Sequence, residues 1–149
     1  MIELRGYDAR DLDAMFRLDE ECFEEPFRFT RSAMRQFAES RKARVVIAES
    51  VGALAGFAIL HAEGRVGYIV TLDVAEDFRR RGLARQLMEA MEQEAEDAAC
   101  AVVGLHVFVG NEAAIRFYER VGYERVGDVP AFYGDGLDAW VYRKKLEQT

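Results

Sequence analysis

The feature that most constrains the fold is a strand that passes through a basic, glycine-containing loop into a helix. Residues 67–74 are rich in β-branched and aromatic side chains, which is typical of a buried strand. Apolar side chains then recur at helical spacing from Leu83 to Ala95. The loop between them contains Arg79–Arg81 and Gly82. A helix N-terminus leaves N–H groups unpaired and attracts anions, so this junction predicts a pyrophosphate site. The alternative is a helix start with a solvated basic patch.

A second junction of the same kind follows at residues 102–123. Residues 102–109 have the alternation of a strand, and Asn111 is a good helix N-cap. Gly122 is suited to the position that ends this helix. Tyr118 lies on the apolar face of the helix, where it is either an ordinary core residue or a functional one. A buried phenol needs a partner for its hydroxyl in both cases.

The patterns along the chain predict an α/β (α+β) protein with one mixed sheet of about seven strands and helices on both faces. The expected strands cover residues 2–6, 44–50, 53–62, 66–75, 101–109, 123–128 and 137–146. The expected helices cover residues 9–22, 30–40, 82–98 and 112–121. With 149 residues, we expect residues 1–149 to form a single domain.

Composition narrows the class of partner. A formal net charge of −7 argues against nucleic acid and suits an amine or a basic peptide. No apolar run reaches the roughly 20 residues of a membrane span, so no membrane association is expected. Cys22 and Cys100 lack metal-binding spacing, so we expect no metal, reduced thiols and a cytoplasmic location. We interpret His61, within an apolar run, as structural. We interpret the acidic cluster at residues 19–25 as a solvated helix end rather than a substrate site.

The two junctions together resemble the GNAT family of N-acetyltransferases. Arg79-x-x-Gly82-x-Ala84 resembles that family's acetyl-CoA motif, and the block from Asn111 to Tyr123 resembles its second motif. The expected order of elements is similar to the family along the whole chain. The resemblance implies that acetyl-CoA lies between two splayed strands, which end near Val74 and Val109.

The resemblance also implies roles for individual residues. Asn111 would bind the pantetheine arm, Tyr118 would protonate the departing thiolate, and a backbone N–H near Val74 would stabilise the oxyanion. N–H groups of residues 80–85 would hold the pyrophosphate. The full set implied for acetyl-CoA is Leu72, Asp73, Val74, Arg79, Arg80, Arg81, Gly82, Leu83, Ala84, Arg85 and Asn111.

Within the family, the chain is especially similar to enzymes that acetylate protein N-termini. Phe27 lies in a loop that resembles their substrate loop, and Phe132 and Tyr133 lie in a segment that resembles their substrate hairpin. Ordinary aromatic packing is the alternative for both loops. His106 occupies the place where the bacterial branch has a glutamate base. An imidazole with a pKa of about 6.5 can accept a proton through water, but a lone strand histidine is more often structural.

The sequence therefore predicts an N-acetyltransferase that moves an acetyl group from acetyl-CoA to a primary amine, with a protein or peptide N-terminus as the acceptor. A small-molecule amine is the alternative acceptor. A non-catalytic acyl-CoA-binding sensor is the alternative from another class, since the glutamate is missing. We expect a monomer or a homodimer.

Overall fold

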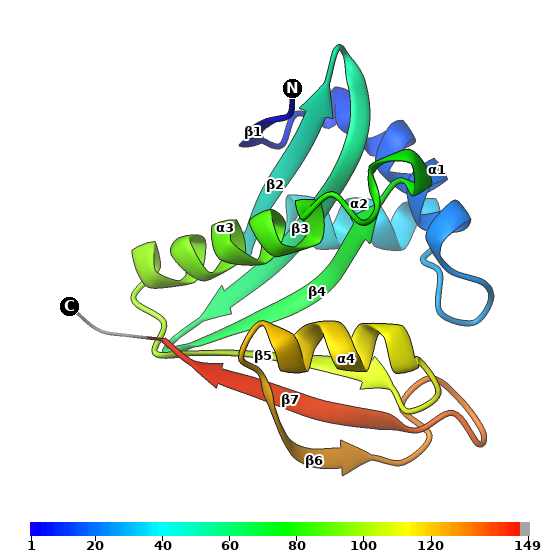
Figure 1. Cartoon of the computed structure of the whole chain (residues 1–149), viewed down its shortest axis with the longest axis vertical. Coiled ribbons are helices and arrows are strands. Elements are labelled where there is room, and N and C mark those ends of the chain that lie inside the picture. Colours follow the sequence, from blue (N-terminus) through cyan, green and yellow to red (C-terminus); the bar gives the residue numbers. More distant parts are fainter. Residues whose placement is uncertain (147–149) are drawn as a thin grey trace.

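The computed structural model describes residues 1–146, and it is built on one seven-stranded sheet with the order β1-β2-β3-β4-β5-β7-β6 (Figure 1). β4 and β5 pair in parallel, and the other neighbours pair antiparallel. The strands are β1 Glu3–Gly6, β2 Ala43–Ser50, β3 Ala53–Glu63, β4 Val66–Val74, β5 Val102–Phe108, β6 Glu124–Val129 and β7 Ala139–Lys145. The predicted mixed sheet is thus confirmed.

Helices cover both faces of the sheet, as predicted (Figure 1). Helices α1 (Leu12–Cys22) and α2 (Arg31–Glu39) lie on one face. Helices α3 (Leu83–Asp97) and α4 (Glu112–Arg120) lie on the other. In the part of the chain that the structure describes, no helix combines the length and the apolar character that a membrane crossing requires.

Several element boundaries differ from the prediction by one or more residues, and three of these differences have a local reason. The helix expected from residue 9 begins as a 3₁₀ turn, because Asp8 caps Ala9–Asp11 before α1 starts. α3 starts one residue later than predicted, because Gly82 is its N-cap in the left-handed conformation. The strand expected from residue 137 starts at Ala139, because Gly134 and Gly136 have positive φ and form a turn.

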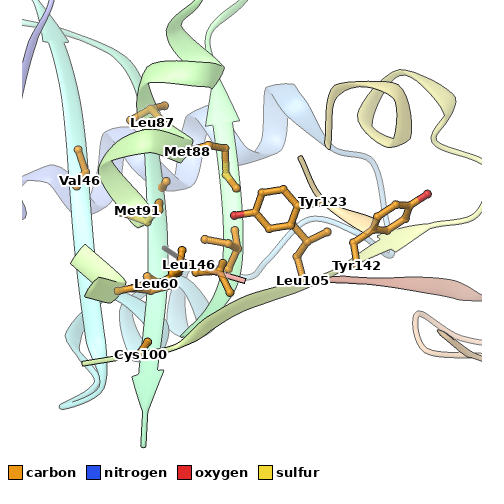
Figure 2. Close-up of a cluster of buried hydrophobic side chains, with 14 of the residues drawn as sticks. Val46, Leu60, Leu87, Met88, Met91, Cys100, Leu105, Tyr123, Tyr142 and Leu146 are labelled. Atoms are coloured by element: carbon orange, nitrogen blue, oxygen red, sulfur yellow. The ribbon is translucent and has the colours of Figure 1, made fainter. Parts of the chain in front are cut away.

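Two apolar cores hold the layers together. Figure 2 shows the larger core, in which Leu87, Met88 and Met91 of α3 face Val46 and Leu60 of the sheet. Leu105, Tyr123 and Tyr142 extend this core to the other half of the molecule (Figure 2). The smaller core joins α1 and α2 to β2 and β3 through Met15, Met34, Ile47, Phe57 and Ile59.

The two halves of the sheet are joined at one end only. The β4–β5 ladder consists of Val66 with Val102, Gly67 with Val103, and Tyr68 with Gly104. β4 then continues to Val74 and β5 to Phe108 without further pairing between them. Figure 1 shows the two strands diverging from this junction. The predicted splayed strand pair is therefore present.

Candidate functional site

The loop between β4 and α3 forms a cradle of unpaired N–H groups. Arg79 N donates to Glu76 O at 3.2 Å, and Gln86 N donates to Gly82 O at 3.1 Å. Between these two bonds, the N–H groups of residues 80–85 donate to no backbone carbonyl of the described chain. Gly82 has φ 79° and Arg80 has φ 63°, so the chain turns sharply into the helix. An exposed run of N–H groups at a helix N-terminus is suited to a phosphate group.

The side chains of the basic loop point in different directions and have different contacts. The Arg79 guanidinium turns back toward β4, where its Nε donates to Val74 O at 3.0 Å. Its NH2 group lies 3.6 Å from Cys22 Sγ, so Arg79 joins the end of β4 to α1. Leu83 is buried in the α3 core, and Ala84 is half-buried. The exposed Arg80 and Arg85 are free of ion pairs within residues 1–146.

The end of β4 alternates between the two faces of the sheet. Leu72 and Val74 pack against the α3 core, so their backbone rather than their side chains is available to a ligand between the strands. Asp73 points to the opposite face and is only 1% exposed. Its carboxyl lies on the side of the sheet that α1 covers, near the Asp19 carboxyl.

Helix α4 presents the other two predicted residues. Asn111 caps the helix, with its Oδ1 accepting from Ala114 N at 3.2 Å, as the sequence predicts. Tyr118 packs between Phe117 and Tyr123, with ring centroids 5.2 and 6.0 Å away. Burial raises the pKa of the Tyr118 phenol above its usual range. Tyr118 is therefore protonated at neutral pH and can act as a donor.

The structure adds Tyr68 to the site, which sequence reasoning missed. Tyr68 OH on β4 shares a hydrogen bond of 2.9 Å with His106 Nδ1 on β5. Tyr68 lies in the last rung of the β4–β5 ladder, opposite Gly104, and His106 lies two residues beyond that rung, where the strands begin to diverge. Burial raises the pKa of Tyr68 to about 12 and lowers that of His106. At neutral pH both side chains are therefore uncharged.

An aromatic cluster surrounds this pair. Phe132 stacks on the His106 ring with centroids 4.1 Å apart and planes 5° from parallel. Phe27, from the loop between α1 and α2, packs on Phe108 at 4.9 Å and on Tyr133 at 5.0 Å. The two loops singled out in the sequence thus meet beside His106. The two loops therefore pack on each other through these aromatic side chains, and a role of the same side chains in binding stays a prediction.

The other histidine is structural, as predicted. His61 Nε2 lies 2.8 Å from Phe37 O, which ties β3 to α2. The interpretation of the acidic cluster was wrong for one residue. Asp19 is fully buried, because it lies on the apolar stripe of α1 with Leu12 and Met15. The other acidic residues of the cluster, Glu20, Glu21, Glu24 and Glu25, are exposed as expected.

A sheet split beside a cradle of free N–H groups at a helix N-terminus is typical of proteins that bind a phosphate-containing cofactor. Residues 12–123 match the Acetyltransferase (GNAT) family, and the chain belongs to that family. It is therefore an enzyme that transfers an acetyl group from acetyl-CoA to an amine.

Relatives agree with this assignment. An uncharacterized N-acetyltransferase of Methanocaldococcus jannaschii is 30% identical over 143 residues, which cover 95% of this chain and 90% of the relative. An N-alpha-acetyltransferase of Saccharolobus solfataricus is 35% identical over 83 residues, which cover 55% of this chain and 50% of the relative.

A solved structure extends the likeness of fold to the whole chain. The ribosomal-protein-S18-alanine N-acetyltransferase of Escherichia coli superposes with a TM-score of 0.88 at 22% identity, covering 100% of this chain and 96% of that one. At this identity the superposition speaks for the fold.

Proposed function

We propose that this enzyme acetylates the α-amino group of a protein or peptide N-terminus. The observation that carries the proposal is the position of the Tyr68–His106 pair, at the start of the gap and beside the meeting point of two aromatic loops. An extended chain end can enter between such loops and present a single amine. Relatives named N-alpha-acetyltransferase, including the one from Saccharolobus solfataricus, support this acceptor.

The residues of the cradle and the gap fit acetyl-CoA. The unpaired N–H groups of residues 80–85 would hold its pyrophosphate, and the unpaired backbone of β4 up to Val74 would hold its pantetheine arm. When bound, acetyl-CoA supplies a thioester carbonyl that an amine can attack. An N–H of β4 near Val74 is the group we assign to the developing oxyanion.

The amine must lose a proton before it attacks, and we assign that proton to the Tyr68–His106 pair. His106 is neutral at physiological pH, because burial lowers its pKa. With Nδ1–H donating to the Tyr68 oxygen, Nε2 is the free base that accepts the proton, directly or through a water. Phe132 holds the ring in this orientation by stacking on it.

We assign the opposite proton transfer to Tyr118. Burial holds its phenol in the protonated form, and it lies on α4, packed against the larger core. We expect it to donate this proton to the sulfur of the leaving thiolate. Base and acid then belong to different elements, with the reacting groups between them.

An acceptor screen that follows CoA release tests the proposal. Short peptides with a free N-terminus should be acetylated, and the same peptides with a formylated N-terminus should not. A polyamine and an amino sugar are the comparison substrates. Turnover of these small amines alone would assign the enzyme to small-molecule acetylation. Tight acetyl-CoA binding with turnover of none would favour an acyl-CoA sensor.

A further inference from the structure

Two buried carboxyl groups lie together behind the end of β4. Asp19 on α1 is 0% exposed, and Asp73 on β4 is 1% exposed. The two side chains are within hydrogen-bonding reach of each other. Nothing in the mechanism above uses either carboxyl. Burying charge without a partner is costly, so an arrangement of this kind requires a specific hydrogen-bonding solution.

Each carboxyl has one satisfied oxygen. Asp19 Oδ2 accepts from Phe29 N at 2.7 Å, and Asp73 Oδ1 accepts from Thr71 Oγ1 at 2.6 Å. The remaining oxygens, Asp19 Oδ1 and Asp73 Oδ2, accept no N–H or O–H from the described residues. One proton placed between them satisfies both oxygens and leaves one negative charge on the pair. Two carboxyls sharing a site hold a proton in this way.

The surrounding charges favour retention of that proton. Burial and the charge of Asp19 raise the pKa of Asp73 well above its usual range. The opposing positive charge is that of Arg79. Its guanidinium bonds to Val74 O and lies beside Cys22 Sγ, and it bonds to neither carboxylate. Glu20 on α1 adds a negative charge that further favours the protonated pair. Asp73 thus carries the proton and Asp19 the charge.

Asp19 also closes the loop that carries Phe27. Its backbone carbonyl accepts from Phe23 N at 2.9 Å, and its carboxylate accepts from Phe29 N. Both ends of residues 23–29, the acceptor loop, are therefore held by one residue. From this loop Phe27 reaches Phe108 and Tyr133 in the aromatic cluster. A continuous chain of contacts therefore runs from Asp73 on β4, through Asp19 and the acceptor loop, to the aromatic cluster beside His106.

We propose that Asp73 is a positioning residue, which holds the acceptor loop beside β4 through one proton shared with Asp19. The loop's role in acceptor binding rests on the proposed function, whereas the shared proton does not. The folded protein retains this proton when the unfolded chain, with aspartate pKa values of about 3.9, has lost it. Stability must therefore fall as pH rises from about 4 toward the raised pKa of the pair, by up to about tenfold in the unfolding equilibrium constant per pH unit.

The decisive variants are Asp73→Asn and Asp19→Asn, which preserve size and supply an amide N–H donor in place of the shared proton. Urea unfolding from pH 4.5 to 8.5 should show the falling stability in the wild type and a flatter profile in both variants. The exposed Glu21→Gln on the same helix is the matched control and should keep the wild-type slope. Equal slopes in wild type and Asp73→Asn would overturn the shared proton.

Hydrogen exchange and kinetics test the positioning. At pH 8.5, amides of residues 23–29 should exchange at least about tenfold faster in the wild type than in Asp73→Asn, and the KM for an acceptor peptide should rise with pH more than kcat falls. Identical exchange in the two proteins would overturn the link to the loop. If the stability slopes and the exchange rates are as expected but no peptide is acetylated, the shared proton and the loop contact are supported and the acceptor proposed above is wrong.

Discussion

At the scale of single residues, His106 has its ring fixed from two directions. Tyr68 bonds to its Nδ1 at 2.9 Å, and Phe132 stacks flat on its face. These contacts give the residue the features of a structural histidine and of an oriented base at the same time. Its uncharged state follows from burial, which lowers its pKa. What separates the two roles is therefore the pH dependence of the reaction.

If His106 is the base, kcat/KM should rise with pH through an ionisation below the ordinary histidine value of about 6.5, because burial disfavours the protonated ring. His106→Ala should remove this limb, and His106→Glu should retain more activity than His106→Ala. The profile is measured by steady-state kinetics across pH 5 to 9. His61→Ala is the matched control, since the chain has two histidines and the His61 ring bonds to Phe37 O, whereas the His106 ring bonds to Tyr68 OH. A limb that survives in folded His106→Ala would assign the base elsewhere.

Tyr118 is the residue whose loss should affect the chemical step most selectively. Tyr118→Phe removes only the donor, so kcat should fall by about 10²-fold or more, the usual scale for a general acid. The affinity for acetyl-CoA, measured by calorimetry, should change little. Tyr123→Phe is a useful comparison, because its hydroxyl bonds to Glu92 within the core and has no place in the mechanism. Near-native turnover by Tyr118→Phe would contradict the assignment.

At the scale of elements, the turn into α3 joins two properties within residues 80–85. Gly82 supplies a left-handed backbone that other residues adopt with strain, and the free N–H groups follow immediately. This juxtaposition was predictable from sequence, because strand, glycine and helical periodicity are all local patterns. The capping role of Asn111 was predictable for the same reason.

Gly82→Asp should abolish acetyl-CoA binding, because it places a negative charge in the cradle. Calorimetry measures the binding, and far-UV circular dichroism checks the fold. Gly52→Asp is the matched control, since Gly52 also has positive φ and open space around it but lies in the turn between β2 and β3. Unchanged affinity in folded Gly82→Asp, or equal loss in both variants, would refute the cradle.

The contacts that could not be predicted from the sequence join residues on elements that are distant along the chain. Tyr68 and His106 are 38 positions apart, and their contact depends on the register of β4 against β5. Asp19 and Asp73 meet only because α1 packs over the end of β4. Neither register nor helix placement leaves a periodic signal in the chain. The charged appearance of residues 19–25 concealed the one aspartate that faces inward.

At the scale of the whole molecule, the two halves of the sheet are held together by the short β4–β5 ladder and by the shared core around Leu105, Tyr123 and Tyr142. A ligand that bonds to both diverging strands must therefore stabilise the folded state as a whole. The same reasoning ties thermal stability to the concentration of acetyl-CoA.

Acetyl-CoA at 100 times its Kd should stabilise the fold by about 2.7 kcal/mol. For a chain of this size, that corresponds to a rise in Tm of roughly 5–10 °C. Differential scanning fluorimetry over a range of acetyl-CoA concentrations measures the shift. The rise should be absent in Gly82→Asp and present in Gly52→Asp. A Tm independent of acetyl-CoA in the wild type would contradict binding between the strands.

The divergence of β4 from β5 has one more consequence, for the solubility of the protein. Beyond Tyr68 the two strands turn unpaired backbone edges toward each other, inside the sheet and not at its rim. An unpaired edge is a template for any extended segment, including one from a neighbouring copy. Acetyl-CoA bound between these edges, as proposed above, would therefore also shield them from self-association. Purification and storage with CoA present should keep the enzyme dispersed at concentrations where the stripped protein aggregates.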